Sequence, residues 1–161
     1  MPDLLAALYH LPDLTPALEE AQRNGFQVRR VLPPEKPIVL AWIERHFSAA
    51  WAAECDVAFS RQPPACFVAT HDEVLCGFAA YEATCRNFFG PFGVHPDFRG
   101  HHLGKALLLQ ALHAMRAEGY AYAIIGGVGP VDFFQKTVNA MVIENSAPGI
   151  YQGMLRPPRE V

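Results

Sequence analysis

The stretch that decides the fold is Val94-His95-Pro96-Asp97-Phe98-Arg99-Gly100-His101-His102-Leu103-Gly104-Lys105-Ala106. It joins an apolar strand to an amphipathic helix through a basic turn that contains glycine. Backbone N–H groups in the first turn of a helix lack partners inside the helix, and the helix dipole adds about half a positive charge at that end. An anion would satisfy those groups, so the junction is suited to a phosphate or a diphosphate.

Side chains in the same turn supply further charge and hydrogen-bond donors. Arg99 and Lys105 are cationic, and His101 and His102 each carry ring nitrogens that can donate. Together with the backbone N–H groups of residues 100–105, they predict a diphosphate site. The alternative interpretation is an ordinary turn that begins a core helix.

Residues Arg99 to Gly104 resemble the Arg/Gln-x-x-Gly-x-Gly/Ala signature of the GNAT superfamily of acyl-CoA N-acyltransferases, and Lys105-Ala106 follow them. His102 occupies the position of the first signature glycine. In that family the loop binds the pyrophosphate of coenzyme A, and the splayed strand before it pairs with the pantetheine arm. The resemblance therefore implies acetyl-CoA as the acyl donor. The coenzyme-binding residues that it implies are Phe92, Gly93, Val94, Arg99, Gly100, His101, His102, Leu103, Gly104, Lys105 and Ala106.

Composition limits the classes of protein that fit the chain. With 161 residues, 51% of them hydrophobic, the chain is long enough for one domain with its own core. Its net charge is −3, from 13 basic and 16 acidic residues without long runs of one sign. This balance argues against a nucleic-acid-binding surface, which depends on many cationic contacts to phosphate. Small molecules or proteins are the expected partners.

The cysteines and the N-terminal sequence bear on compartment and metal binding. Cys55, Cys66, Cys76 and Cys85 form no Cys-x-x-Cys pair and have no histidine at metal-binding spacing, so we expect four reduced thiols and no metal. The sequence begins Met-Pro-Asp, without the cations of a secretory signal, and has no apolar run of about 18 residues. We therefore expect a cytoplasmic protein that does not enter a membrane.

Periodicity and turn residues predict the order of the elements. Apolar residues at helical spacing predict helices over 14–24, 35–47, 49–59, 103–118 and 131–138. Alternation or short apolar runs predict strands over 26–31, 65–70, 74–83, 88–94, 121–125, 140–144 and 150–155. Residues 65–83 form a hairpin in this interpretation, and Pro91 with its neighbouring glycines makes the strand at 88–94 bulged or splayed.

This order is the layout that the GNAT resemblance implies, so the similarity extends over about residues 26–155. The expected fold is a mixed α/β (α+β) architecture, with a mostly antiparallel central sheet of six to seven strands, helices on both faces and a splayed central strand. Residues 1–161 are expected to form a single domain, with a short helical extension before residue 26. The oligomeric state stays open, a homodimer included.

A second glycine-rich run, Gly126-Gly127-Val128-Gly129, invites a comparison with dinucleotide-binding loops. It lacks the Gly-x-Gly-x-x-Gly spacing, and no acidic residue follows about 20 positions later on a strand. The run is better interpreted as a turn after the strand 121–125.

The expected acid of the reaction is missing from its usual place. Residues 132–136 resemble the Phe-Tyr-Glu-Lys segment of the GNAT family, whose tyrosine usually protonates the departing coenzyme A thiolate. Phe134 stands at the position of that tyrosine, and a phenyl ring has no proton to donate. Tyr151 or Tyr122 are the alternative acids. A thiol has a pKa of about 8.5, so a thiolate can also leave without help.

The reaction implied by the resemblance is attack of an amine on a thioester, which needs an oxyanion donor and a proton acceptor. The backbone N–H of Val94 is the expected oxyanion donor. Glu82 and His95 are the nearest ionisable candidates for the base. The same resemblance implies that the helices carrying His46, Trp51 and Glu54 line the acceptor pocket. These three side chains also fit packing or surface roles. The sequence does not identify the acceptor.

Three functions from different classes fit the sequence. The first is an acetyl-CoA-dependent N-acetyltransferase that acts on a primary amine of a small molecule or a protein. The second is an acyl-CoA-binding module with little or no activity, which the departures at His102 and Phe134 favour. The third is a structural or oligomerising domain. We expect the first.

Overall fold

The computed structural model describes residues 1–158. Its strands are β1 Leu4–Ala7, β2 Gln27–Arg30, β3 Cys66–His71, β4 Val74–Tyr81, β5 Phe88–Val94, β6 Tyr122–Ile125 and β7 Met141–Val142. They form a seven-stranded sheet in the order β2-β3-β4-β5-β6-β1-β7. All neighbours are antiparallel except β5 and β6, which are parallel. This mixed, mostly antiparallel sheet confirms the predicted fold class.

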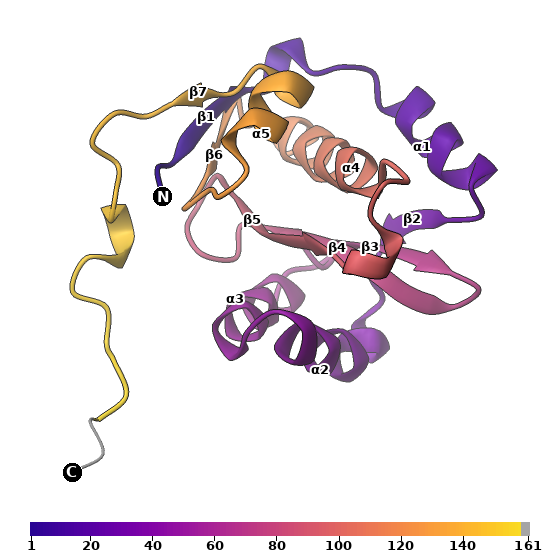
Figure 1. The fold of residues 1–161 in the computed structure, drawn as a ribbon, viewed down its shortest axis with the longest axis horizontal. Helices are drawn as coiled ribbons and strands as arrows, with labels where there is room; N and C mark the ends of the chain where they lie inside the picture. The colour runs from indigo at the N-terminus through magenta and orange to yellow at the C-terminus, as the bar shows by residue number, and fades with distance from the viewer. Residues whose placement is uncertain (159–161) are drawn as a thin grey trace.

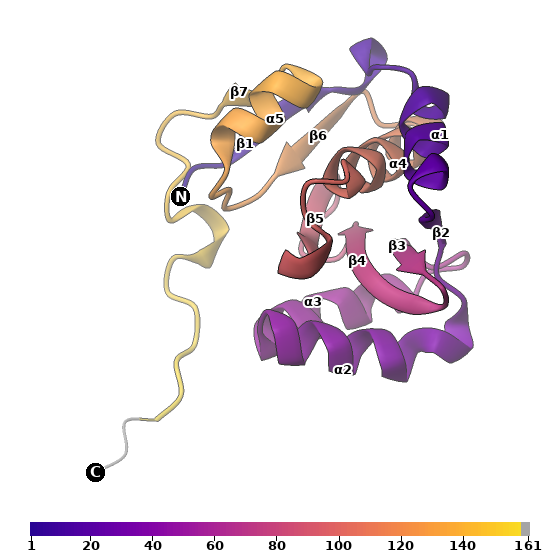
Figure 2. The ribbon, with the colours of Figure 1, turned by 45° about the vertical axis from the view of Figure 1, so that its right-hand side comes forward.

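Helices cover both faces of the sheet. They are α1 Leu14–Arg23, α2 Lys36–His46, α3 Ala49–Phe59, α4 Leu103–Ala117 and α5 Val131–Val138, with short 3-10 turns at Leu8–His10, Pro33–Glu35, Pro96–Phe98 and Gly149–Tyr151. The helices α2 and α3 pack on one face, and α1, α4 and α5 lie on the other (Figures 1 and 2). All five helices were predicted from the sequence to within a few residues. Within residues 1–158, no helix combines the length and the apolar character needed to cross a bilayer.

Helix α4 packs across the central strands β3, β4 and β5. The predicted apolar stripe of this helix is confirmed, because Leu103, Leu107, Leu108, Ala111, Leu112 and Met115 are all buried. On the opposite face, α3 begins at Ala49 because the Ser48 hydroxyl accepts a hydrogen bond from the Trp51 N–H at 3.1 Å. Burial of these apolar faces from both sides holds the sheet in place.

Two strands diverge in the middle of the sheet, as the sequence predicted. β5 and β6 pair only at Phe88 with Ile124 and at Phe89 with Ile125, after which β6 ends. The rest of β5 pairs with β4 alone, from Phe92 opposite Ala79 to Val94 opposite Gly77. The parallel pair therefore opens into a gap beyond Phe89, on the side of β5 away from β4.

The two ends of the chain differ from the prediction. Leu4–Ala7 forms β1 between β6 and β7, with Leu4 opposite both Ile125 and Val142. The predicted final strand over 150–155 is wrong, because Gly149–Tyr151 is a 3-10 turn and the chain then extends away past the N-terminus (Figure 2). The place beside β6 is already filled by β1. The run Leu4-Leu5-Ala6-Ala7-Leu8 is apolar throughout, so it carries no period-two signal that would mark a strand.

Candidate active site

A large cleft occupies the gap between β5 and β6 and has a volume of about 1180 Å³. The His95 N–H donates to the Cys76 oxygen of β4 at 2.9 Å. Because backbone groups alternate in direction along a strand, the N–H and C=O groups of Phe92 and Val94 point the opposite way, into the cleft. The Val94 oxygen already accepts from Arg99 Nε, so the strand offers an extended ligand the N–H groups of Phe92 and Val94 and the oxygen of Phe92.

One end of the cleft is the turn that begins α4. Ala106 donates its N–H to the His102 oxygen at 3.2 Å and so closes the first helical turn. Among the residues that the structure describes, none of the N–H groups from Gly100 to Lys105 donates to a backbone acceptor outside the helix. They meet the requirement for binding an anion at a helix N-terminus.

The backbone of this turn depends on two residues with positive φ. Gly100 has a φ of +87°, and a Cβ atom there would have no neighbour within 4 Å, so the space beside it is open. His102 has a φ of +58°, in the left-handed region that a signature glycine adopts without steric cost. Its imidazole points away toward α1, with Nε2 3.8 Å from Oε1 of Glu20. The His102 side chain is therefore directed away from the N–H groups of the turn.

Most of the predicted coenzyme residues lie along the cleft. Those that line it are Phe92, Gly93, Val94, Arg99, Gly100, His102, Leu103, Gly104 and Lys105. Two others do not: the His101 ring packs on Phe26, with centroids 5.3 Å apart, and Ala106 is buried. Arg99 donates from Nε to the Val94 oxygen at 3.2 Å, which ties the loop to the end of β5.

The comparisons with known proteins agree with this geometry. The sequence profile of the acetyltransferase (GNAT) family matches residues 17–134, which is well over half of the chain. The chain belongs to the GNAT family. No curated protein matches its sequence.

Solved structures of GNAT proteins share the fold at low sequence identity. A glucosamine N-acetyltransferase region of a fungal β-N-acetylglucosaminidase superposes with a TM-score of 0.71 at 14% identity, covering 88% of this chain and 19% of that one. A GCN5-related N-acetyltransferase from Sphaerobacter thermophilus superposes with a TM-score of 0.68 at 15% identity, covering 88% of this chain and 48% of that one. A GNAT acetyltransferase from Brucella melitensis, solved with acetyl-CoA, superposes with a TM-score of 0.55 at 17% identity. The match covers 73% of this chain and 86% of that one. The chain thus spans less than half of the first two proteins.

Aromatic side chains form the wall of the GNAT cleft on the α5 side. Phe134 is buried at 3% exposure and packs against Phe89 and Phe92, with ring centroids 6.3 and 6.0 Å away. Phe133 stacks on Phe92 with an interplanar angle of 15°. The residue at the usual tyrosine position therefore fills an apolar cluster and can only contribute packing.

The phenol of Tyr151 reaches the cleft from the C-terminal segment. Its hydroxyl donates to Oε1 of Glu54 on α3 at 3.3 Å, and the hydroxyl of Thr84 donates to the same oxygen at 3.0 Å. All three residues line the cleft. Partial burial, and then the negative charge of Glu54, raise the pKa of Tyr151 above its ordinary value. The phenol is therefore protonated at neutral pH.

The two candidate bases lie outside the cleft lining. The carboxylate of Glu82 is 4% exposed and accepts from Arg61 Nη1 at 2.8 Å, from the Tyr120 hydroxyl at 2.9 Å and from the Asn87 N–H. These three donors hold it in place outside the cleft. Tyr122, the second alternative acid, shares a hydrogen bond of 3.0 Å with the Tyr9 hydroxyl on the surface and does not line the cleft.

His95 belongs to an aromatic cluster at the end of β5. Its Nδ1 accepts from the Asp97 N–H at 3.2 Å, which leaves the proton of the neutral ring on Nε2. The ring meets His46 edge to face, with centroids 4.6 Å apart. Loss of solvation, and then the nearby His95, lower the pKa of His46. Neither histidine is part of the cleft lining.

Sequence reasoning missed the residues that shape the far wall of the cleft. The Gly126 to Gly129 turn lines it and is held by the N-terminal segment, since Asp3 Oδ1 accepts from the Gly127 N–H at 2.8 Å and the Pro2 oxygen from the Val128 N–H at 2.9 Å. Thr84 was also missed. Neither the anchoring of the glycine turn by Pro2 and Asp3 nor the hydrogen bond from Thr84 to Glu54 has a local sequence signal, because both join distant segments.

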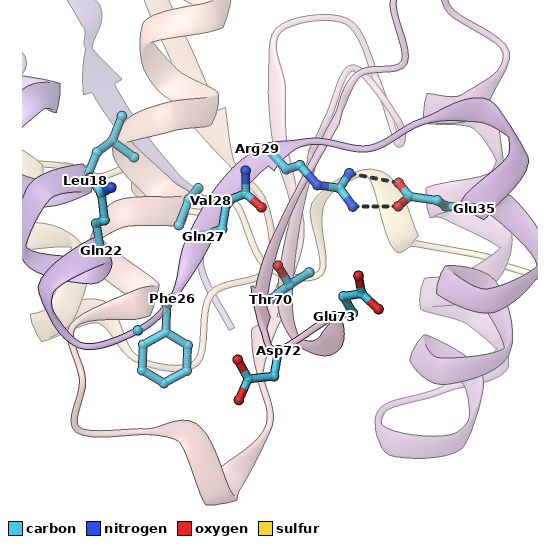
Figure 3. Close-up of a pocket in the computed structure, with 11 residues that line it drawn as sticks. Leu18, Gln22, Phe26, Gln27, Val28, Arg29, Glu35, Thr70, Asp72 and Glu73 are labelled. Carbon is cyan, nitrogen blue, oxygen red and sulfur yellow. Dashed lines mark hydrogen bonds and ion pairs between the residues drawn. The ribbon is translucent and has the colours of Figure 1, made fainter.

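A second hollow of about 900 Å³ lies beside the edge strand β2, between α1 and the turn from β3 to β4 (Figure 3). Its principal cation, Arg29, makes two hydrogen bonds to the carboxylate of Glu35, at 2.9 and 2.5 Å. Asp72 and Glu73 stand opposite this pair (Figure 3). No residue of the GNAT cleft is part of this hollow, and its one arginine is already neutralised.

Proposed function

We propose that this chain transfers an acetyl group from acetyl-CoA to a primary amine of a small molecule or a protein. The observation that carries the proposal is the series of free N–H groups at the start of α4, opening into a cleft whose other wall is the unpaired edge of β5. Amides and cations suit the diphosphate of the donor, and the strand edge suits an amide-containing arm.

The residues present fit such a donor. Arg99 and Lys105 supply positive charge at the diphosphate end, and the open space at Gly100 leaves the loop accessible. Bound there, the donor supplies an acetyl thioester whose carbonyl carbon is open to attack. The Val94 N–H, directed into the cleft, would donate to the carbonyl oxygen as negative charge develops on it.

Tyr151 is the proposed acid in place of the missing family tyrosine. Its phenol is protonated, lines the cleft and is anchored by Glu54, whereas Phe134 has no proton to give. A positioned acid lowers the barrier for departure of the thiolate.

The buried Phe134 also favours a second function, an acyl-CoA-binding module with little activity. Two measurements distinguish the proposals. If acetyl-CoA binds, a concentration of about 100 times its dissociation constant stabilises the fold by about 2.7 kcal/mol, which thermal unfolding detects. Release of free coenzyme A thiol with a panel of amines then shows turnover. A rise in the unfolding temperature without thiol release supports the binding module. If acetyl-CoA does not change the unfolding temperature, both proposals are contradicted.

A further inference from the structure

Glu54 lines the cleft, and one of its two carboxylate oxygens has no partner in the described residues. Its Oε1 accepts from Tyr151 and Thr84, at 3.3 and 3.0 Å. In the part of the chain that the structure describes, its Oε2 accepts no hydrogen bond from the protein. The two donors fix the orientation of the carboxylate and leave one oxygen free for a ligand.

Glu54 also differs from the other half-buried glutamates, each of which lies beside a basic side chain. Glu35 pairs with Arg29, Glu82 pairs with Arg61, and Glu20 lies 3.8 Å from the His102 ring. Among the described residues, no Lys, Arg or His lies within ion-pair distance of Glu54. It is the one carboxylate that lines the cleft within residues 1–158. An unpaired negative charge in a partly enclosed site calls for a cationic ligand.

Charge in the cleft is separated from one end to the other. Arg99 and Lys105 stand at the α4 end, where the diphosphate is proposed to bind, and Glu54 stands on α3, across the sheet. Figure 1 shows these two helices on opposite faces of the sheet. The donor and a cationic acceptor would therefore approach the gap in β5 from opposite faces, each drawn by the opposite charge.

The surface next to Glu54 is aromatic. Trp51 precedes it by three residues on α3, so the two side chains share one face of the helix, with Cβ atoms about 5 to 6 Å apart. Phe47 stacks on Trp51 with centroids 5.2 Å apart and an angle of 20°, and both rings line the cleft. A ring two or three bonds from an ammonium group would lie on this surface while the nitrogen meets Glu54.

We infer that the acceptor is a small primary amine that carries an aromatic or similar apolar group close to its nitrogen, and that Oε2 of Glu54 binds its ammonium group and removes a proton from it. This inference rests on the proposed acetyl transfer for its chemistry. A lysine side chain fits less well, because its nearest apolar atoms are followed by a polar peptide.

Protons and bonds balance through Glu54 and Tyr151. The ammonium proton moves to Glu54, and the freed lone pair on nitrogen forms the new C–N bond to the acetyl carbon. The C–S bond breaks with its electron pair on sulfur, which takes the proton of Tyr151. Glu54 then releases the proton from Oε2 to water, Tyr151 regains a proton from water, and the remaining excess proton on nitrogen leaves to water. The products are an acetamide, a free thiol and one proton.

The test compares the wild-type chain with Glu54→Gln, which keeps an oxygen for Tyr151 and Thr84 but removes the charge. Calorimetry measures binding of 2-phenylethylamine to the protein without donor, and binding of acetyl-CoA separately. We expect Glu54→Gln to weaken amine binding by about 10- to 100-fold, since a charge-assisted contact is lost. Acetyl-CoA affinity should not change. The matched control is Glu44→Gln on the exposed side of α2, which should alter neither.

Steady-state rates complete the test with 2-phenylethylamine, butylamine, glucosamine and a lysine peptide as acceptors. We expect the highest kcat/KM for 2-phenylethylamine, and for Glu54→Gln a loss of kcat/KM together with a changed pH profile. Trp51→Ala should raise the KM for 2-phenylethylamine more than that for butylamine.

Equal amine affinity in Glu54→Gln and wild type overturns the inference, and so does a preference for glucosamine or the lysine peptide. Amine binding that depends on Glu54 in a protein that does not bind acetyl-CoA would instead refute the proposed function and leave the ammonium site standing.

Discussion

Phe47 packs against Gly93 so closely that a Cβ atom on this glycine would lie 2.5 Å from Cζ of the ring. Gly93 is on β5 and Phe47 follows α2, and both line the cleft. The ring can occupy that face of the splayed strand only because position 93 has no side chain.

Gly93→Ala should therefore displace Phe47 and destabilise the protein by about 1 to 3 kcal/mol, the usual cost of overpacking. Urea unfolding measures the loss. The control is Gly104→Ala, where the new Cβ atom meets Phe92 and Phe133 at ordinary distances of 3.5 and 3.6 Å. If both variants are equally stable, Phe47 is not held by close packing at Gly93.

Gly104→Pro should abolish acetyl-CoA binding and keep the fold. Proline is tolerated in the first turn of a helix but has no N–H, so one donor to the diphosphate is lost. Gly104→Ala keeps that N–H and should bind acetyl-CoA as well as the wild type does. Calorimetry compares the two, and unchanged affinity in the proline variant contradicts the diphosphate assignment.

The double substitution Arg99→Glu and Lys105→Glu should also remove acetyl-CoA affinity, because it places two negative charges beside the diphosphate. Arg116→Glu, in the last turn of the same helix, changes charge away from the loop and is the control. Affinity should be lost in the double variant at low and at high salt. Retention at either salt concentration would count against the loop as the binding site.

His102→Gly should raise the unfolding free energy by about 0.5 kcal/mol, because glycine adopts the left-handed region without the steric cost that histidine pays there. His101→Gly is the matched control, since residue 101 has no positive φ and loses its packing on Phe26. It should lower stability by about 0.5 to 1 kcal/mol. If both substitutions raise, or both lower, the free energy of unfolding, this explanation is contradicted.

Tyr151→Phe should lower kcat by about 100-fold and leave acetyl-CoA affinity unchanged, if the phenol is the acid. Stopped-assay thiol release measures kcat, and calorimetry measures affinity. Tyr122→Phe is the control, because its hydroxyl pairs with Tyr9 outside the cleft. Unaltered turnover in Tyr151→Phe would show that the thiolate leaves without this proton.

Tyr81 should make stability depend on alkaline pH. It is fully buried, donates to Glu118 Oε1 at 2.6 Å, and burial is the main cause that raises its pKa. A tyrosine whose pKa is higher in the folded state stabilises the fold at every pH below its pKa in the unfolded state. That stability is lost as the pH rises above about 10. Urea unfolding at pH 8 and at pH 10.5, on the wild type and Tyr81→Phe, should show a smaller alkaline loss in the variant.

Local pattern was enough to predict the helices, the hairpin and the splay of β5. Each of these is encoded within about 20 residues, as the buried stripe on α4 and the proline and glycines of residues 90–93 show. The left-handed His102 was not foreseen, because nothing in its type requires positive φ.

What sequence reasoning missed depends on contacts between distant segments. β1 is a strand because β6 and β7 provide partners on both sides, and residues 150–155 are no strand because that position is taken. The pairing of Glu54 with Tyr151 joins residues 97 positions apart. The family resemblance implied an acceptor pocket lined by the helix that carries Glu54, but only the fold brings the Tyr151 phenol to that carboxylate.

The way in which Pro2 and Asp3 hold the Gly126 to Gly129 turn has a practical consequence for work with purified protein. Met1 itself lines the cleft, immediately before these anchoring contacts. Any affinity tag joined in front of Met1 would begin at a residue that lines the cleft and would place extra chain beside the ligand site. Ligand titrations should therefore be carried out after such a tag has been cleaved off.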